Sequence, residues 1–448
     1  MTATLSPTIE PVQAARLLPG YRFEVVKLLA QGRIRCVLLV CLVVPAGFVA
    51  VISQQSALPT DTVFGRWMHT TGWAGSLVIL AFACSWGLPL LVSLVAGDVF
   101  AAEDRLGTWR HLLVAVRSPR RIFVAKALAS LTIIVLLVLL LMGSSIVGGL
   151  AAVGNHPLVG LDGHNLAPAA AARTVLLTWL CVLAPTLAFA AVGLLGSVVL
   201  GRSPMGLLVP AVLALAMDLV LMLPVPVGVR LALPSNAFQA WRGLYTDPAH
   251  LGPLLIGILV SLVWAAVATG LAYVLFVRRD FTDLSNDGAG RRTLVAAALP
   301  LALLVGATTL ALSAVTPASG TGIEKGKLER SLATAFAHLY VLQTQQLHRP
   351  SVTETQLATS ASCDKAGSRV ADHGPGNDWR CVVTWHLPGA TATGSAIYQL
   401  DVAAEGRYVA DGDGPKDVNG SFQLRTATGD APNPLWQFDG YVDLLDHL

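Results

Sequence analysis

Seven apolar runs alternate with polar, charge-bearing segments along the first two thirds of the chain. Each run approaches the roughly 20 residues that an α-helix needs to cross the hydrocarbon core of a bilayer. The pattern therefore predicts seven membrane spans, at 34–52, 73–97, 127–154, 175–200, 207–227, 253–277 and 294–315.

Two segments precede the first span. Residues 1–15 are polar and contain prolines, which predicts a disordered cytoplasmic tail. In residues 16–35, apolar positions such as Phe23 and Val26 recur at helical spacing among basic ones. This spacing indicates an amphipathic helix lying in the membrane interface. The alternative, a frayed start to the first span, is less favoured because Pro19 and Gly32 interrupt the chain on either side.

No apolar run of that length follows the seventh span, and residues 316–448 predict a soluble domain. Apolar residues recur at helical spacing over 324–349, which predicts a helix. Apolar and polar residues alternate at 379–387, 395–402 and 421–427, which predicts strands. The predicted fold is an all-α polytopic membrane bundle, with a six-span core over 34–280 and a seventh span, followed by a small α+β domain. The partly apolar loop 228–252 is predicted either as short helices dipping into the outer leaflet or as an ordinary surface loop.

Composition and charge support this membrane assignment and give it an orientation. The chain is 54% hydrophobic and only 13% charged, against about 25% charged in a soluble domain. Sixteen Lys and Arg residues fall on the side of the N-terminus and four on the opposite side. Because basic residues concentrate in cytoplasmic loops, we expect a cytoplasmic N-terminus. An odd number of spans then places the C-terminal domain outside.

The six cysteines divide between the two compartments. Four lie in predicted spans, where cysteine acts as a small apolar residue. Cys363 and Cys381 lie in the outer domain, where an oxidising environment permits a disulfide. Two cysteines allow one pairing, so the sequence predicts a Cys363–Cys381 disulfide, with two free thiols as the alternative.

Catalytic and nucleotide-binding motifs are not found. The string nearest to a phosphate-binding loop, at 321–328, begins with Thr, ends in Leu and lies in the predicted outer domain. His156, His164 and Asp162 share one outer loop, but a solvated loop explains them better than a metal site. We therefore predict that this chain is not an enzyme and binds no metal, cofactor or nucleic acid.

Asp218 is a carboxylic acid near the middle of the predicted fifth span. A carboxylate at the bilayer centre costs about 2.5–3.5 kcal/mol on insertion scales, so it should face the bundle interior or water. Asp218 is thus a candidate residue of a translocation path. A structural carboxyl bonded to Ser or Thr on a neighbouring helix explains it equally well.

The segment 98–126, between the second and third spans, is the most patterned part of the sequence. Acidic residues begin it, where a helix N-terminus favours negative charge, and a helix is predicted over 99–116. Gly107 is unexpected within a helix, which glycine weakens by about 1 kcal/mol, and suggests a bend or a close backbone approach. A plain positive-inside loop explains the later arginines but not the acidic residues or the Gly-Thr pair.

The segment "AEDRLGTWRHLLVAVRSPRRIFVAK" (102–126) resembles the first cytoplasmic loop of type-2 ABC exporter permeases. The resemblance extends over about 16–280, and the seventh span and outer domain depart from the six-span pattern of that family. The following residues carry it in the loop: Glu103, Asp104, Gly107, Thr108, Leu112, Leu113, Ser118, Arg120, Arg121 and Lys126.

The resemblance implies a permease subunit that pairs with a second permease copy or homologue in the bacterial cytoplasmic membrane. Two separate ATPase subunits would bind ATP and Mg²⁺ and dock on this loop. The expected ATPase-coupling residues are Glu103, Asp104, Arg105, Gly107, Thr108, Trp109, Arg110 and Leu113. The expected anchors to anionic lipid are Arg117, Arg120, Arg121 and Lys126. The alternative function is a membrane-anchored sensor or assembly factor whose outer domain binds a ligand or partner.

Overall fold

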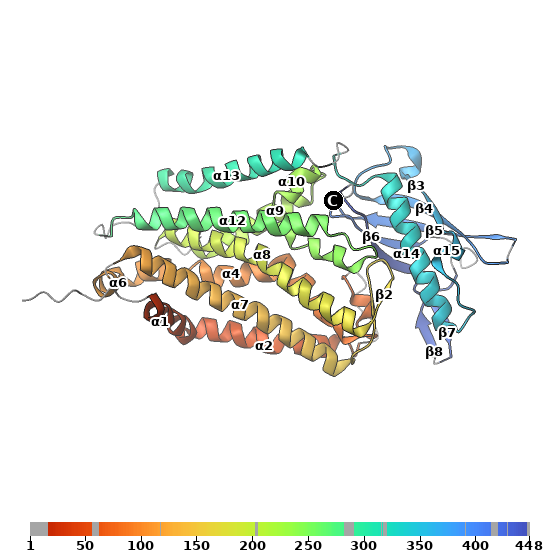
Figure 1. Ribbon diagram of the computed structural model, residues 1–448, viewed down its shortest axis with the longest axis horizontal. Coiled ribbons are helices and arrows are strands. Elements are labelled where there is room, and N and C mark those ends of the chain that lie inside the picture. The colour runs from red at the N-terminus through yellow and green to blue at the C-terminus, as the bar shows by residue number, and fades with distance from the viewer. Residues whose placement is uncertain are drawn as a thin grey trace, which may run out of the picture.

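A helical bundle forms one end of the molecule and a sheet-containing domain forms the other (Figure 1). The computed structural model describes residues 17–55, 62–116, 118–201, 205–281, 291–314, 316, 320–389, 391–413, 420–427 and 429–445. The predicted tail 1–15 and Arg117 lie outside these residues. The arrangement agrees with a polytopic membrane protein that carries a separate α+β region.

Six helical segments in the described part of the chain are long and apolar enough to cross a membrane. The second is built from α3 (Gly72–Phe82), a π-helical turn (Ala83–Gly87) and α4 (Leu88–Ala96). The other five are α2 (Gly32–Ile52), α7 (Pro119–Ala152), α8 (Pro168–Leu200), α12 (Gly252–Val277) and α13 (Arg291–Ser313). A separate helix, α1 (Leu17–Ala30), precedes α2 and packs against α7.

The fifth predicted span is shorter than expected. Helix α9 runs over Met205–Leu221, so it ends six residues before the predicted boundary at 227. Pro224 and Pro226 follow, and proline cannot donate the backbone hydrogen bond that would continue the helix. At 17 residues, α9 is about 25 Å long, close to the lower limit for a membrane span.

The loop that follows α9 folds into short helices, which is the local structure of the first of the two alternatives expected for residues 228–252. These helices are α10 (Val227–Leu231), α11 (Pro234–Ala237) and the 3₁₀ helix η3 (Ala240–Tyr245). Trp241 and Tyr245 are fully buried and pack their rings against Phe64. The loop therefore closes the end of the bundle nearer the sheet domain, with an aromatic cluster that it shares with Phe64.

The C-terminal domain packs one long helix against an antiparallel sheet. Helix α14 (Lys325–Gln346) agrees with the predicted 324–349, and α15 (Glu354–Leu357) follows it. The sheet has the order β3-β4-β5-β6-β9, and its strands are β3 (Ser360–Lys365), β4 (Gly376–His386), β5 (Thr393–Val402), β6 (Arg407–Gly412) and β9 (Gln437–Tyr441). The predicted strand 421–427 instead contains β7 (Gln423–Thr426), which pairs with β8 (Gly429–Pro432) in a separate hairpin.

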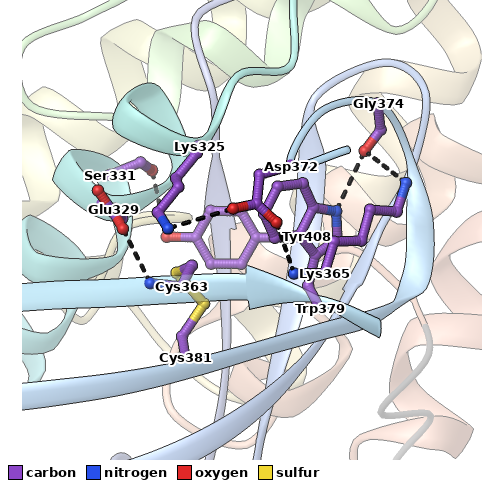
Figure 2. Close-up of a disulfide and its surroundings, with 10 residues drawn as sticks. All are labelled: Lys325, Glu329, Ser331, Cys363, Lys365, Asp372, Gly374, Trp379, Cys381 and Tyr408. Atoms are coloured by element: carbon purple, nitrogen blue, oxygen red, sulfur yellow. Dashed lines mark hydrogen bonds and ion pairs between the residues drawn. A yellow bond between two sulfur atoms is a disulfide. The ribbon is translucent and has the colours of Figure 1, made fainter. Parts of the chain in front are cut away.

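The predicted disulfide is confirmed. Cys363 and Cys381 lie opposite each other on β3 and β4 and are joined through their sulfur atoms. Both are buried beneath α14, from which the Glu329 carboxylate accepts a hydrogen bond of 2.9 Å from the Cys363 backbone N–H (Figure 2). Another α14 side chain, Ser331, lies 3.1 Å from the Tyr408 hydroxyl. The disulfide therefore lies in the contact between helix and sheet.

Replacing both Cys363 and Cys381 with serine should destabilise the C-terminal domain. The cysteines are 18 residues apart, and closing a loop of that size contributes about 3 kcal/mol in the chain-entropy model. Urea unfolding of the full chain in detergent, followed by tryptophan fluorescence, measures the difference. A matched control replaces Cys36 and Cys181, which are free, and should leave the curve unchanged. Equal unfolding midpoints for the wild type and the Cys363/Cys381 variant would contradict the prediction.

Candidate functional site

The segment between α4 and α7 forms two short helices at the end of the bundle opposite the sheet domain (Figure 1). They are α5 (Ala101–Leu106) and α6 (Trp109–Val116), in place of the single helix predicted over 99–116. Gly107 separates them in the left-handed conformation, with φ 66°, which glycine adopts without strain. No atom lies within 4 Å of where a Cβ would be. Of the two roles considered for Gly107, the structure therefore supports a bend.

Glu103 is the centre of a buried ionic network. Its carboxylate is 1% exposed and accepts a hydrogen bond of 2.7 Å from the Lys126 ammonium on α7. It also contacts the Lys27 ammonium on α1 and the Thr108 hydroxyl. Lys126, itself 2% exposed, reaches a second carboxylate on α1, that of Glu24, at 3.0 Å. One cluster of charges therefore joins α5 to α1 and α7.

Asp104 joins the same helix to the end of α12. Arg279, just after that helix, donates two hydrogen bonds to its carboxylate, at 2.9 and 2.5 Å. The Trp109 indole N–H donates a third, at 2.7 Å. The Trp109 ring is buried among the rings of Phe100, Phe276 and Phe281. A bidentate arginine fixes orientation as well as distance, so α5, α6 and α12 are held as one unit.

Contacts of Asp98 and Ser197 attach the loop to two further helices, α2 and α8. Asp98 is buried and pairs with Arg33 on α2 at 2.5 Å and with Arg105 at 2.6 Å. The Ser197 hydroxyl of α8 accepts hydrogen bonds of 2.9 Å from the backbone N–H groups of Phe100 and Ala101. The loop is thus bound to α1, α2, α7, α8 and α12, and a displacement of α5 would act on all of these helices.

Several of the expected ATPase-coupling residues face the interior of the bundle. Glu103, Asp104 and Trp109 are all buried in contacts within the chain. A carboxylate at the end of an apolar bundle is stabilised by a cation and hydrogen bonds, and those are supplied internally. Thr108 is half-buried against Glu103, and Leu113 is half-buried against the bundle core.

Of the described residues expected to anchor the loop to lipid, one is buried and two reach the surface. Lys126 is buried between two carboxylates and cannot reach a lipid headgroup, because its ammonium is enclosed by α1 and α5. Arg120 is exposed and Arg121 is half-buried. Of the expected anchors that the structure describes, Arg120 and Arg121 therefore remain candidates for contact with anionic lipid.

The exposed part of the loop is basic and apolar. Leu106 is 70% and Val114 is 74% exposed. Arg110 and His111 are exposed between them along the chain, and Arg105 is partly exposed beside its ion pair with Asp98. We call these five residues the exposed loop surface. Two of its members, Arg105 and Arg110, are among the expected coupling residues.

The partners of these acids were not predicted from the sequence. Lys27, Arg33 and Arg279 entered only the count of basic residues that gives the orientation, and Glu24 was not considered. One signal was present: Glu24 is the single acid among the basic residues of the predicted interfacial helix 16–35. In the structure Glu24 is buried against the bundle, while Phe23 and Val26 of the same helix are exposed, as a lipid-facing surface would be.

Asp218 lies on α9 beside the outer short helices. It is half-buried, and the Ser235 side chain of α11 hydrogen-bonds to it. This contact is of the kind that the structural alternative required. Among the described residues, no contact of Asp218 indicates that it takes part in a translocation path.

A second polar cluster joins the opposite end of the bundle to the sheet domain. Arg66 and Arg407 both contact the buried carboxylate of Asp439 on β9. Arg242, on η3, pairs with Glu405 of the sheet domain at 2.6 Å. Next to these pairs is a cavity of about 380 Å³ between the loop 246–250 and α14. In the described residues no group of three His, Cys, Asp or Glu side chains is arranged to hold a metal ion.

Comparison with known proteins assigns no family to this chain. None of the known protein families matches its sequence. No curated protein is significantly similar to it.

Removing the Lys126 charge should destabilise the bundle strongly. In Lys126→Met, the buried carboxylate of Glu24 would lose its cation and Glu103 would keep only Lys27. Removing one partner of a buried ion pair typically costs about 3–5 kcal/mol. Thermal unfolding of the purified chain in detergent measures the loss. Arg110→Met, on the exposed loop surface, is the matched control and should lie within about 0.5 kcal/mol of wild type. If Lys126→Met unfolds at the same temperature as the wild type, the network does not hold the helices together.

Proposed function

We propose that this chain is the transmembrane permease subunit of an ABC exporter, moving a substrate across the bacterial cytoplasmic membrane. A separate ATPase subunit would bind ATP and Mg²⁺ and dock on the 98–126 loop. The observation that carries the proposal is the attachment of this loop to five helices through Glu103, Asp104, Asp98 and Ser197. A loop so attached can pass the motion of a docked partner to the bundle.

The resemblance supplies the identity of that partner and the expectation of a second permease copy. The structure refines how the contact would be made. Because the acids are used internally, the docking surface is the exposed loop surface, with Leu106 and Val114 as apolar contacts and Arg105 and Arg110 as cations. A complementary ATPase surface would present carboxylates around an apolar socket.

The outer domain fits this proposal as a fixed cover. Ion pairs from Arg66 and Arg242 hold it against the outer loops, and a backbone hydrogen bond of 2.8 Å joins Val227 to Gly320. A substrate leaving the bundle would meet the junction between these parts. The N-terminus and the loop would then be cytoplasmic and the sheet domain extracytoplasmic.

The double variant Leu106→Glu/Val114→Glu should abolish ATPase binding without unfolding the bundle. Buried apolar anchors at interfaces typically contribute 2 kcal/mol or more each, and the new carboxylates would also repel an acidic partner. The measurement is recovery of a co-expressed ABC ATPase from the same organism in a pull-down, with unfolding temperature recorded in parallel. We expect recovery to fall at least about tenfold.

The matched control is Val370→Glu, the same change at an exposed position of the sheet domain, which should keep full ATPase recovery. Glu103→Lys should instead lower the unfolding temperature, because it places a third cation beside Lys126 and Lys27. Full ATPase recovery with the double variant would remove the docking role from this surface. It would then favour the alternative of a membrane-anchored sensor or assembly factor.

A further inference from the structure

A second cavity, of about 480 Å³, lies between the start of α8, the hairpin β1–β2 (Leu158–Val159 and Asn165–Leu166) and the loop after η3. It is at the end of the bundle nearer the sheet domain, where β2 is labelled in Figure 1. Its apolar lining includes Leu166, Leu177 and Leu244, and its charged lining includes Arg173 and Asp247. We call it the α8 cavity. It combines a hydrocarbon surface with charges of both signs.

The α8 cavity lies at the edge of the surface that α8 presents to lipid. Three exposed leucines, Leu176, Leu177 and Leu180, mark the lipid-facing side of this apolar helix. Arg173 precedes the first two by three and four residues, which places it on the same face one turn earlier. The guanidinium is therefore at the level where hydrocarbon meets headgroups, and Leu177 belongs both to the cavity and to the lipid-facing surface.

Arg173 differs from the other basic residues of the bundle loops at this end. Arg66 pairs with Asp439, and Arg242 pairs with Glu405. Arg230 is buried and donates a hydrogen bond of 2.9 Å to the Leu221 carbonyl. Arg173 is exposed, and no residue in the described part of the chain forms an ion pair or hydrogen bond with its side chain. Its charge is thus available to a ligand.

The acidic side of the cavity is held in position by the hairpin. The Asp247 backbone N–H donates a hydrogen bond of 2.7 Å to the buried carboxylate of Asp162. Asp162 also contacts His164, which lines the cavity, and its backbone carbonyl lies 3.0 Å from Nδ1 of His338 on α14. The Asp247 side chain itself is exposed and forms no ion pair within the described residues. A fixed backbone with an available carboxylate lowers the ordering cost of binding.

The two charges select the kind of ligand. Arg173 and Asp247 line one cavity without pairing with each other. A purely anionic ligand would be attracted by the guanidinium and repelled by the carboxylate. A ligand with a phosphate and a primary ammonium satisfies both, because a guanidinium binds phosphate through a fork of N–H groups and an ammonium donates hydrogen bonds to a carboxylate. The leucines add a surface for a hydrocarbon chain.

We propose that the α8 cavity is a binding site for phosphatidylethanolamine. Arg173 holds the phosphate, Asp247 receives the ammonium, and an acyl chain follows Leu177 along α8 into the bilayer. A phosphatidylglycerol headgroup offers no cation to Asp247, and the trimethylammonium of phosphatidylcholine has no N–H to donate. The site depends on α8 crossing the membrane and is independent of the proposed transport function.

Native mass spectrometry of the full chain in detergent tests the headgroup preference. Dioleoyl phosphatidylethanolamine, phosphatidylcholine and phosphatidylglycerol are added separately at equal concentrations, and the fraction of lipid-bound protein is measured. We expect phosphatidylethanolamine to bind at least about threefold more tightly than either of the others, since ion pairs at exposed groups are modest in strength. Equal binding of the three lipids, or a preference for phosphatidylglycerol, would overturn the proposal.

Two variants separate the two charges. Arg173→Gln should weaken phosphatidylethanolamine and phosphatidylcholine alike, because both carry the phosphate. Asp247→Asn should bring phosphatidylethanolamine down to the level of phosphatidylcholine. Both side chains are exposed, so the unfolding temperature should stay that of the wild type. The controls are Arg349→Gln and Asp430→Asn, at exposed positions of the sheet domain, which should keep the wild-type preference. A wild-type preference in Asp247→Asn would contradict the role of the carboxylate and overturn the proposal.

A soluble competitor distinguishes a lipid from a small zwitterion. O-Phosphoethanolamine carries the same phosphate and ammonium but has no acyl chain to contact Leu177. Added in excess to the complex with phosphatidylethanolamine, it should leave the bound fraction unchanged, because apolar contact contributes to lipid binding. Displacement of the lipid would show that the headgroup alone occupies the cavity, and the assignment to a membrane lipid would be wrong.

Discussion

The bundle depends on the neutralisation of Lys126. An ammonium enclosed at the end of an apolar helix is tolerated only when opposite charge lies beside it, and Glu103 and Glu24 provide that charge from two other helices. Because the carboxylates come from α5 and α1, the requirement fixes both helices against α7. Asp104 and Asp98 extend the same principle to α12 and α2. The charged end of the molecule is therefore an ordered part of the bundle.

The opposite end is held by a different set of charges. Asp439 lies between two arginines, Arg242 pairs with Glu405, and Asp162 lies between two histidines. These groups come in part from the bundle loops and in part from the sheet domain, so the two regions are joined by contacts that depend on charge.

The sequence predicted the features that depend on local pattern. Span positions, helix α14, strands β4 and β5 and the disulfide follow from apolar run length, periodicity and cysteine count. The end of α9 was misplaced because a run of hydrophobic residues continues through Pro224 and Pro226. Strands β6 and β9 were missed because "RYVADG" and "QFDGY" are short and contain glycine and aspartate. The burial of Glu103 could not be predicted, since its partners Lys27 and Lys126 come from helices whose packing the sequence does not specify.

The central claim is that the bundle crosses a membrane with the 98–126 loop and the sheet domain on opposite sides. Single cysteines at Arg110 and at Val370, in a variant without the four free cysteines, would report this directly through a membrane-impermeant thiol reagent applied to cells. The account predicts that the cysteine at position 370 reacts in intact cells and that the cysteine at position 110 reacts only after the membrane is permeabilised. Labelling of both positions in intact cells, or of neither, would contradict it.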